Sequence, residues 1–244
     1  MAKIDLKNTS GFPLTYDGDS LRTDKLTFEQ ELNVGIDEIK NQLLNKSLKC
    51  PAIFYKKYIS LDTEGIYKSK KLQINLYILK PNLAGIEYVK TKATMNPKYP
   101  KILEVIYGGG TILLQKYNSP RDQRIIKIAA KKTQKFIVPA GYASVIVNSR
   151  QSSNLIVAEY QHIQTEPEIV LDDTNGMSYY IIRKNAKQEI VRNPYYKIVN
   201  EPEILNWDSI ISEYGITPKT PIIKQIMRKY EKFDWLFKQN SITI

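Results

Sequence analysis

Short stretches in which hydrophobic and polar residues alternate dominate the chain from residue 51 to about residue 192. The clearest is 71–78, where Leu72, Ile74 and Leu76 are separated by polar residues, a period of two that is typical of a half-buried β-strand. Further predicted strands are Ile86–Lys90, Ile102–Tyr107, Thr111–Gln115, Phe136–Val138, Val145–Asn148 and Leu155–Tyr160, followed by a hairpin of Tyr179–Arg183 and Gln188–Val191. Many short strands at regular spacing predict an all-β barrel or sandwich.

Helical spacing of hydrophobic residues is confined to the two ends of the chain. Near the N-terminus it covers Ile36–Leu44, and near the C-terminus Asn206 is expected to cap a short helix that ends at Gly215. A second C-terminal helix is predicted over Ile222–Lys238, after Thr220 and Pro221. Its apolar face, which we expect to dock on the barrel or on a second subunit, contains Ile222, Ile223, Ile226, Met227, Tyr230, Phe233 and Phe237. We therefore expect a barrel domain over 1–204 and a two-helix extension over 205–244.

The composition is that of a globular protein and excludes several kinds of site. Hydrophobic residues make up 42% of the 244 residues and charged residues 25%. The single cysteine, Cys50, excludes a disulfide framework and a four-cysteine zinc site, and the single histidine, His162, excludes a histidine-rich metal site. No apolar run approaches the length of a membrane span, and the N-terminus has no signal-peptide core. We expect a soluble, cytoplasmic protein that does not contact membranes.

The charge balance is strongly basic, with 36 Lys and Arg residues against 25 Asp and Glu residues and a net charge of +11. Such an excess favours anionic partners, either nucleic acid or phosphorylated metabolites. Only seven of the basic residues are arginine, which argues against base-specific recognition. Two segments concentrate the charge, and the candidate polyanion-binding residues in them are Arg121, Arg124, Lys127, Lys131, Lys132, Lys224, Arg228 and Lys232. The alternative is that these residues only form solvated faces. The first segment could be a basic helix, but we favour a strand, a tight turn and a second strand.

Four segments in order along the chain carry a family resemblance. They are 85–96, 107–115 with its triple-glycine turn, 136–148 with Val138 and Pro139, and Asn193–Lys197 after the predicted hairpin. Together they resemble the cupin-type glucose-6-phosphate isomerases of archaea. The resemblance implies a cupin-type barrel (a double-stranded β-helix, or jelly roll) and a homodimer.

The same resemblance implies a divalent metal held by two histidines, a glutamate and a later histidine. The matching positions in this chain are Thr94, Asn96, Lys101 and Ser144. A protonated lysine cannot ligate a cation and repels it. The family's glutamate is also a candidate proton-transfer base, so its loss removes an acid–base group as well. We therefore expect no metal, no other cofactor and no catalytic residue at these positions.

Several residues could still hold a ligand. Thr91 and Lys92 lie on the segment whose threonine binds sugar phosphate in the family, and Lys101 would leave a positive centre in the place of the metal. The candidate ligand-binding residues are Thr91, Lys92, Lys101 and Tyr160. Because side chains alternate along a strand, Thr91 and Lys92 are expected to face opposite ways.

Three hypotheses for function follow. The favoured one is a metal-free, catalytically impaired homologue of glucose-6-phosphate isomerase that binds a phosphosugar or another anion, or acts as a scaffold. The second is an active glucose-6-phosphate isomerase of glycolysis or gluconeogenesis. The third is a basic protein associated with nucleic acid or ribonucleoprotein, which rests on net charge alone. The resemblance in fold favours the hypothesis of an active isomerase but does not establish activity.

Overall fold

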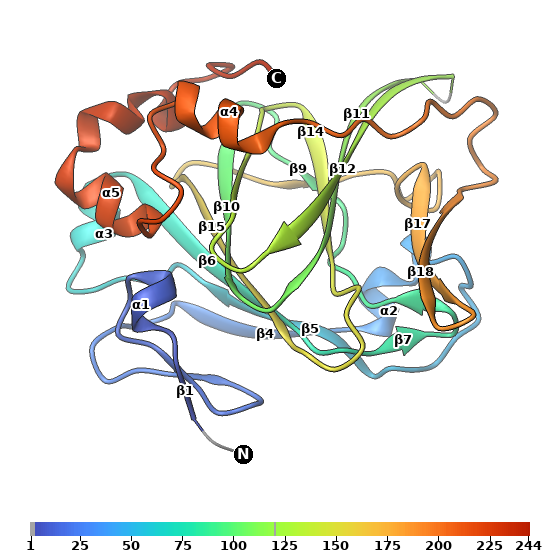
Figure 1. Cartoon of the computed structure of the whole chain (residues 1–244), viewed down its shortest axis with the longest axis horizontal. Coiled ribbons are helices and arrows are strands. Elements are labelled where there is room, and N and C mark those ends of the chain that lie inside the picture. The colour runs from blue at the N-terminus through green and yellow to red at the C-terminus, as the bar shows by residue number, and fades with distance from the viewer. Residues whose placement is uncertain (1–2, 120) are drawn as a thin grey trace.

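Two antiparallel β-sheets face each other and form the body of the molecule in the computed structural model, which describes residues 3–119 and 121–244 (Figure 1). The six-stranded sheet has the order β13-β10-β15-β6-β5-β4 and the five-stranded sheet the order β12-β11-β14-β9-β16. The strands of the first sheet are β4 Gln30–Gly35, β5 Ile53–Ile59, β6 Leu72–Leu79, β10 Lys101–Tyr107, β13 Lys135–Val138 and β15 Leu155–His162. Those of the second are β9 Thr94–Met95, β11 Gly109–Ser119, β12 Asp122–Lys131, β14 Tyr142–Val147 and β16 Glu168–Ile169.

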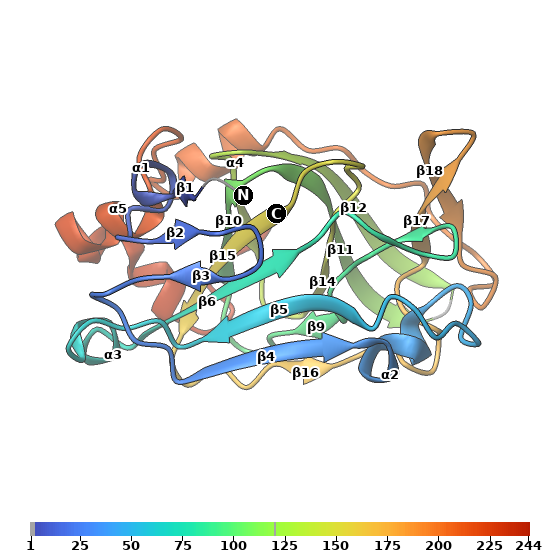
Figure 2. The same cartoon turned by 90° about the horizontal axis from the view of Figure 1, so that it is seen from below.

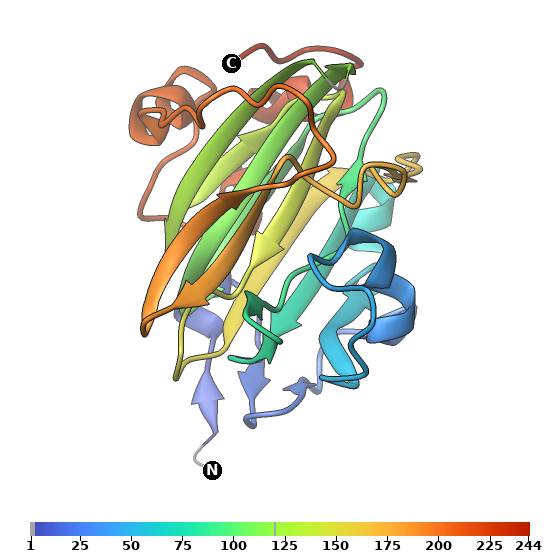
Figure 3. The same ribbon diagram turned by 90° about the vertical axis from the view of Figure 1, so that its right-hand side faces the viewer.

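Two smaller sheets lie beside this body. One contains β1 Ile4–Asp5, β2 Thr15–Tyr16 and β3 Leu21–Arg22, which lie near the N-terminus (Figure 2). The other contains β7 Leu83–Ala84, β8 Glu87–Tyr88 and the hairpin of β17 Tyr179–Lys184 and β18 Lys187–Arg192 (Figure 3). The helices are short: α1 Lys7–Ser10, α2 Ile36–Ile39, η1 Lys40–Gln42, α3 Ile66–Ser69, α4 Trp207–Glu213, α5 Ile222–Arg228 and η2 Tyr230–Phe237.

The predicted strands are present, although Ile86–Lys90 is a strand only over Glu87–Tyr88 (β8). The strand, turn and strand expected over residues 121–135 correspond to β12 and the start of β13. The N-terminal strands were not predicted. β4 is an edge strand with no fully buried residue, so it carries no alternating pattern that sequence analysis could detect. The seven-residue strand β5 was also missed. The remaining missed strands, β1 to β3, β7, β9 and β16, are only two residues long.

The hydrophobic core has three parts because both faces of both sheets are used. Side chains such as Leu103, Val157 and Ile146 fill the space between the two large sheets. The outer face of the six-stranded sheet is covered by both ends of the chain, with Phe12 and Ile226 buried against it. The outer face of the five-stranded sheet is covered by the hairpin of β17 and β18 and the segment before it. Side chains on one face of β10 and β15 therefore point into the space between the two large sheets, and those on the other face point towards the two ends of the chain.

The triple-glycine turn joins β10 to β11 where the backbone passes close to neighbouring strands. Gly108 has a φ of +75°, and a Cβ atom there would lie 2.0 Å from the carbonyl oxygen of Asn154. A Cβ atom on Gly110 would lie 2.3 Å from the carbonyl oxygen of Val147. These glycines are explained by backbone geometry, as expected for a turn that opens no phosphate-binding helix.

The C-terminal segment begins as predicted and then departs from the prediction. The side chain of Asn206 accepts a hydrogen bond from the backbone N–H of Ser209 at 3.3 Å, which caps α4. The long helix expected over Ile222–Lys238 is wrong in its extent, because the backbone breaks at Lys229 (φ −144°, ψ 64°) and continues as η2. Phe233 nevertheless lies in the same buried cluster as Ile222 and Ile226.

This segment packs on its own barrel, which was one of the two expected positions for the apolar face. The apolar face therefore no longer argues for a second subunit, and the homodimer stays a prediction from the family resemblance. Among residues 3–119 and 121–244, no helix has the length and apolar character to cross a membrane.

Candidate functional site

The four positions matched to the family's metal ligands lie at one end of the space between the two large sheets. Thr94 of β9 pairs with Ser144 of β14 in register. Asn96 follows β9, and its amide nitrogen donates a hydrogen bond to Oε1 of Gln161 at 3.0 Å. Lys101 lies opposite Gln161 in the pairing of β10 with β15. The structure therefore brings together the residues that the sequence matched.

Lys101 is paired with a carboxylate that the sequence analysis did not identify. Its Nζ donates to Oε2 of Glu159 at 2.8 Å, and both side chains are at most 4% exposed. The other oxygen, Oε1 of Glu159, accepts hydrogen bonds from Nδ2 of Asn75 at 2.9 Å and from the hydroxyl of Tyr77 at 3.0 Å. We call these four side chains the ionic core. The positive centre expected at Lys101 is therefore neutralised within the protein.

Electrostatics keep Glu159 ionised despite its burial. Burial alone would raise the pKa of Glu159, but the positive charges of Lys101 and Lys57 and the hydrogen bonds from Lys101 and Asn75 lower that pKa to about 2. Burial also raises the pKa of the Tyr77 hydroxyl well above its usual value. A general base works best when its pKa lies near the working pH, and Glu159 is far below that range. Both of its oxygens are also occupied.

The residues at this place do not fit a divalent metal. The matched positions supply two hydroxyls and one amide, and the carboxylate of Glu159 is already bound by an ammonium group. Asn96 Oδ1 is buried without a hydrogen-bond partner, but a single amide oxygen cannot replace two imidazoles and a carboxylate. Within the described ranges, no three His, Cys, Asp or Glu side chains are arranged to hold a metal ion. The ionic core contains Lys101, one of the four matched positions.

The four predicted ligand-binding residues do not line one cavity. Thr91 is buried, and its Oγ1 accepts a hydrogen bond from the backbone N–H of Ile146 at 3.0 Å. Lys92 is partly exposed, with Nζ 3.8 Å from Oδ2 of Asp172. Tyr160 lies on the outer face of its sheet, because residues 159 and 160 alternate, and its hydroxyl donates to Glu104 at 2.8 Å. Only Lys101 of the four belongs to the ionic core.

One sequence signal could have revealed Glu159. It is the only charged residue in the apolar run Leu155–Tyr160, on a strand buried on both faces. A buried carboxylate requires a partner, so a strand of this kind predicts an internal cation. The identity of that cation depends on the pairing of β10 with β15, which the sequence pattern does not reveal.

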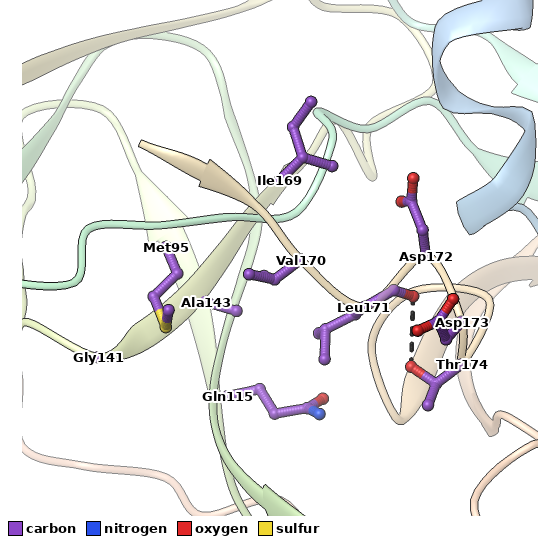
Figure 4. A pocket seen from close by; sticks show the side chains of 10 residues that line it. All are labelled: Met95, Gln115, Gly141, Ala143, Ile169, Val170, Leu171, Asp172, Asp173 and Thr174. Atoms are coloured by element: carbon purple, nitrogen blue, oxygen red, sulfur yellow. Dashed lines mark hydrogen bonds between the residues drawn. The ribbon is translucent and has the colours of Figure 1, made fainter. Parts of the chain in front are cut away.

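A pocket of about 410 Å³ lies on the outer side of the five-stranded sheet, beneath the segment 169–174 (Figure 4). Its walls include the apolar side chains of Met95, Val170 and Leu171. Gln115 is already bonded to the hydroxyl of Tyr196 and to the backbone N–H of Ser178. The remaining lining residues are Gly141, Ala143, Ile169, Asp172, Asp173 and Thr174. Apolar walls with two aspartates make this pocket unsuited to an anionic ligand.

The predicted polyanion-binding residues do not form one surface. Arg124 is bound by Glu203 through two hydrogen bonds of 2.9 and 2.7 Å. Lys132 lies over the ring of Tyr107, 5.9 Å from its centroid. Arg121 is exposed, beside the turn between β11 and β12, and Lys127 and Lys131 lie further along β12. On the C-terminal segment, Arg228 and Lys232 line a common concavity, whereas Lys224 is not part of its lining.

The double-sheet barrel, with the matched ligand positions at one end of its interior, is the arrangement of a cupin-type protein. The sequence model of glucose-6-phosphate isomerase (GPI) matches residues 38–198, about two thirds of the chain, and the chain belongs to this family. Comparison with curated proteins gives no match.

The solved structures to which the chain is similar are distant in sequence. Vicilin from Corylus avellana (hazelnut) is 17% identical, with a TM-score of 0.36, and the match covers 51% of this chain and 34% of vicilin. Oxalate decarboxylase from Bacillus subtilis is 16% identical, also with a TM-score of 0.36, and the match covers 48% of this chain and 28% of the decarboxylase.

Proposed function

We propose that this chain is a metal-free member of the glucose-6-phosphate isomerase family that does not isomerise sugar phosphates and instead binds a phosphorylated or other anionic ligand. The observation that carries the proposal is the buried pair of Lys101 and Glu159 at the position of the family's metal site. A site that an ammonium and a carboxylate already fill has no place for a cation and its substrate oxygens.

The chemistry of isomerisation supports the same conclusion. Moving a carbonyl between neighbouring carbons requires a base that removes a proton and a group that stabilises the developing oxyanion. Glu159 is held as a carboxylate with a pKa of about 2, and Lys101 is committed to it. Neither group is available to a substrate.

The ligand class is supported by the net charge of +11 and by the family resemblance, which implies sugar-phosphate binding. Because the charge of Lys101 is taken up by Glu159, we expect the anion away from the ionic core, at exposed cations that have no acidic partner. The same resemblance and composition support a homodimer in the cytoplasm, and these remain part of the proposal.

An active isomerase is the second candidate, and the family match over residues 38–198 is the observation that favours it. This function would need a base and an electrophile outside the ionic core.

A coupled isomerase assay with glucose 6-phosphate separates the two candidates. The whole chain is treated with a chelator and assayed alone and with added Fe²⁺, Mn²⁺, Ni²⁺ or Zn²⁺. We expect no turnover above the protein-free background under any condition. Turnover of about 1 per second or more, within the ordinary enzyme range, would contradict the proposal. Glu159→Gln is the matched variant, because activity lost in it would locate the chemistry in the ionic core.

A further inference from the structure

A small concavity on the C-terminal segment lies between α5, the start of η2 and the loop 215–220. It has a volume of about 190 Å³. It lies outside residues 38–198, the part of the chain that the family model matches. Two of the basic residues singled out in the sequence, Arg228 and Lys232, lie on its wall together with Lys229.

The loop side of the concavity is fixed by one buried side chain. Gln225 is 9% exposed, and its Nε2 donates hydrogen bonds to the carbonyl oxygens of Thr217 at 2.9 Å and Thr220 at 2.6 Å. Its Oε1 accepts a hydrogen bond from the backbone N–H of Thr217 at 2.7 Å. These three bonds hold the loop against α5, so this wall is formed before any ligand arrives. Preorganisation of this kind lowers the entropic cost of binding.

The basic residues of the concavity lie around the break between α5 and η2. Arg228 is the last residue of α5, Lys229 adopts the non-helical conformation, and Lys232 lies in the first turn of η2. The backbone N–H of Lys232 donates to the carbonyl oxygen of Lys229 at 3.1 Å, which fixes the turn between them. Arg228, Lys229 and Lys232 therefore lie on one wall of the concavity, opposite the loop.

These cations have no acidic partner within the part of the chain that the structure describes. Arg124, by contrast, is fully engaged by Glu203. The hydroxyls of Thr217 and Thr220 likewise make no hydrogen bond among residues 3–119 and 121–244, and both residues line the concavity. Three basic residues and two threonines whose hydroxyls make no hydrogen bond among the described residues therefore line one space.

We propose that this concavity binds the phosphate group of a phosphorylated small molecule. The fork of an arginine matches two phosphate oxygens, lysines add point charges, and hydroxyls donate to the remaining oxygen. The identity of the ligand class rests on the proposed function, but the location rests on the concavity itself. Because the site is open to solvent, the Kd should lie in the millimolar to high-micromolar range.

The test is a titration of the whole chain with glucose 6-phosphate at low salt, followed by amide chemical shifts or calorimetry. The double variant Arg228→Ala, Lys232→Ala should bind about tenfold or more weakly, since it removes two charge-assisted contacts. The matched control is Lys224→Ala, Lys127→Ala, which removes the same net charge outside the concavity and should change affinity less than about twofold. Spectra of each variant without ligand verify that it is folded.

Three further probes identify the source of the signal. Inorganic phosphate should bind and compete with glucose 6-phosphate, and glucose should not bind. Equal weakening in both double variants would overturn the proposal, because the attraction would then be diffuse. The proposal would also be overturned if the unaltered chain failed to bind phosphate. A third contradicting result would be a uridine oligonucleotide that binds more tightly than glucose 6-phosphate and whose affinity falls equally in the Lys224→Ala, Lys127→Ala variant. Isomerase turnover with intact dependence on Arg228 and Lys232 would refute the proposed function and leave this site standing.

Discussion

Two buried lysine–glutamate pairs use the same strand, β10, on opposite faces of the six-stranded sheet. Lys101 points into the barrel and pairs with Glu159 of β15 at 2.8 Å. Glu104 points outward, beneath the C-terminal segment, and pairs with Lys135 of β13 at 3.2 Å. All four side chains are almost completely buried. The pairs therefore differ in their surroundings and not in their exposure.

Their surroundings shift the pKa values of the two carboxylates in opposite directions. The pKa of Glu159 is lowered to about 2, because Lys101 and Lys57 together outweigh burial. The pKa of Glu104 is raised, because burial outweighs Lys135, the hydroxyl of Tyr160 and the backbone N–H of Ile222. Nζ of Lys135 also donates to the carbonyl oxygens of Thr133 at 2.8 Å and Pro218 at 2.6 Å, so its charge is shared among three acceptors.

The comparison shows that burial alone does not decide what a buried ion pair does. The Lys101 pair lies inside the barrel, and Glu159 accepts further hydrogen bonds there from Asn75 and Tyr77. The Glu104 pair is a link to another element, because Glu104 accepts from the first residue of α5 and Lys135 binds the loop before it. The first is expected to govern global stability, and the second the attachment of the C-terminal segment.

The largest effect is expected from Lys101→Met. This change leaves Glu159 buried without its closest cation, which for such pairs costs about 3–5 kcal/mol of unfolding free energy. Urea unfolding measures the loss. The double variant Lys101→Met, Glu159→Gln should recover part of it, because the carboxylate that lost its closest cation is gone as well. Lys68→Met, which breaks the exposed pair with Glu29, is the control and should leave the midpoint unchanged. A loss below about 1 kcal/mol for Lys101→Met would show that the ionic core does not stabilise the barrel.

A smaller and local effect is expected from Glu104→Gln. The amide keeps the shape of the carboxylate but leaves the ammonium of Lys135 without its anion, at a cost of about 1–3 kcal/mol. Hydrogen exchange should become faster in residues 218–228, while strands β6 and β15 stay protected. Unchanged exchange in this segment would refute the assigned attachment, and equal acceleration throughout would show that Glu104 supports the whole sheet.

The two carboxylates should also change the free energy of unfolding in opposite directions as the pH falls. The folded pKa of Glu159 lies below its usual value of 4.5, so its stabilisation is present above pH 4.5 and is lost as the pH falls towards 2. The folded pKa of Glu104 lies above that value, so protonation favours the folded state, and stability gains as the pH falls through that pKa towards 4.5.

Differences between variants and the unaltered protein isolate these contributions, because other carboxylates titrate in all of them. Glu159→Gln should reduce the loss of stability below pH 4.5, and Glu104→Gln should remove a gain above it. Urea midpoints measured from pH 3 to pH 7 test both. If the two difference curves had the same sign, the assigned contrast would be wrong.

Sequence patterns predicted most of the framework, because strands such as β6 and β15 alternate or are continuously apolar. The family resemblance, rather than these patterns, matched Lys101 to a ligand position. The patterns did not predict its partner, since Glu159 lies 58 residues away and meets it only through strand pairing. The choice of Tyr160 for the interior conflicts with the alternation that sends Glu159 inward. The break at Lys229 left no signal, because no glycine or proline occurs between residues 222 and 238.

The central claim is that the ionic core replaces a metal site, and a thermal-shift titration of chelator-treated protein tests it most directly. A ligand present at about 100 times its Kd stabilises the folded state by about 2.7 kcal/mol, which raises the melting midpoint of a chain this size by several degrees. With saturating Mn²⁺ or Ni²⁺ we expect a change of less than about 1 °C. A saturable rise of several degrees that disappears in Glu159→Gln would contradict the account, because it would show that the carboxylate of Glu159 binds a metal rather than Lys101.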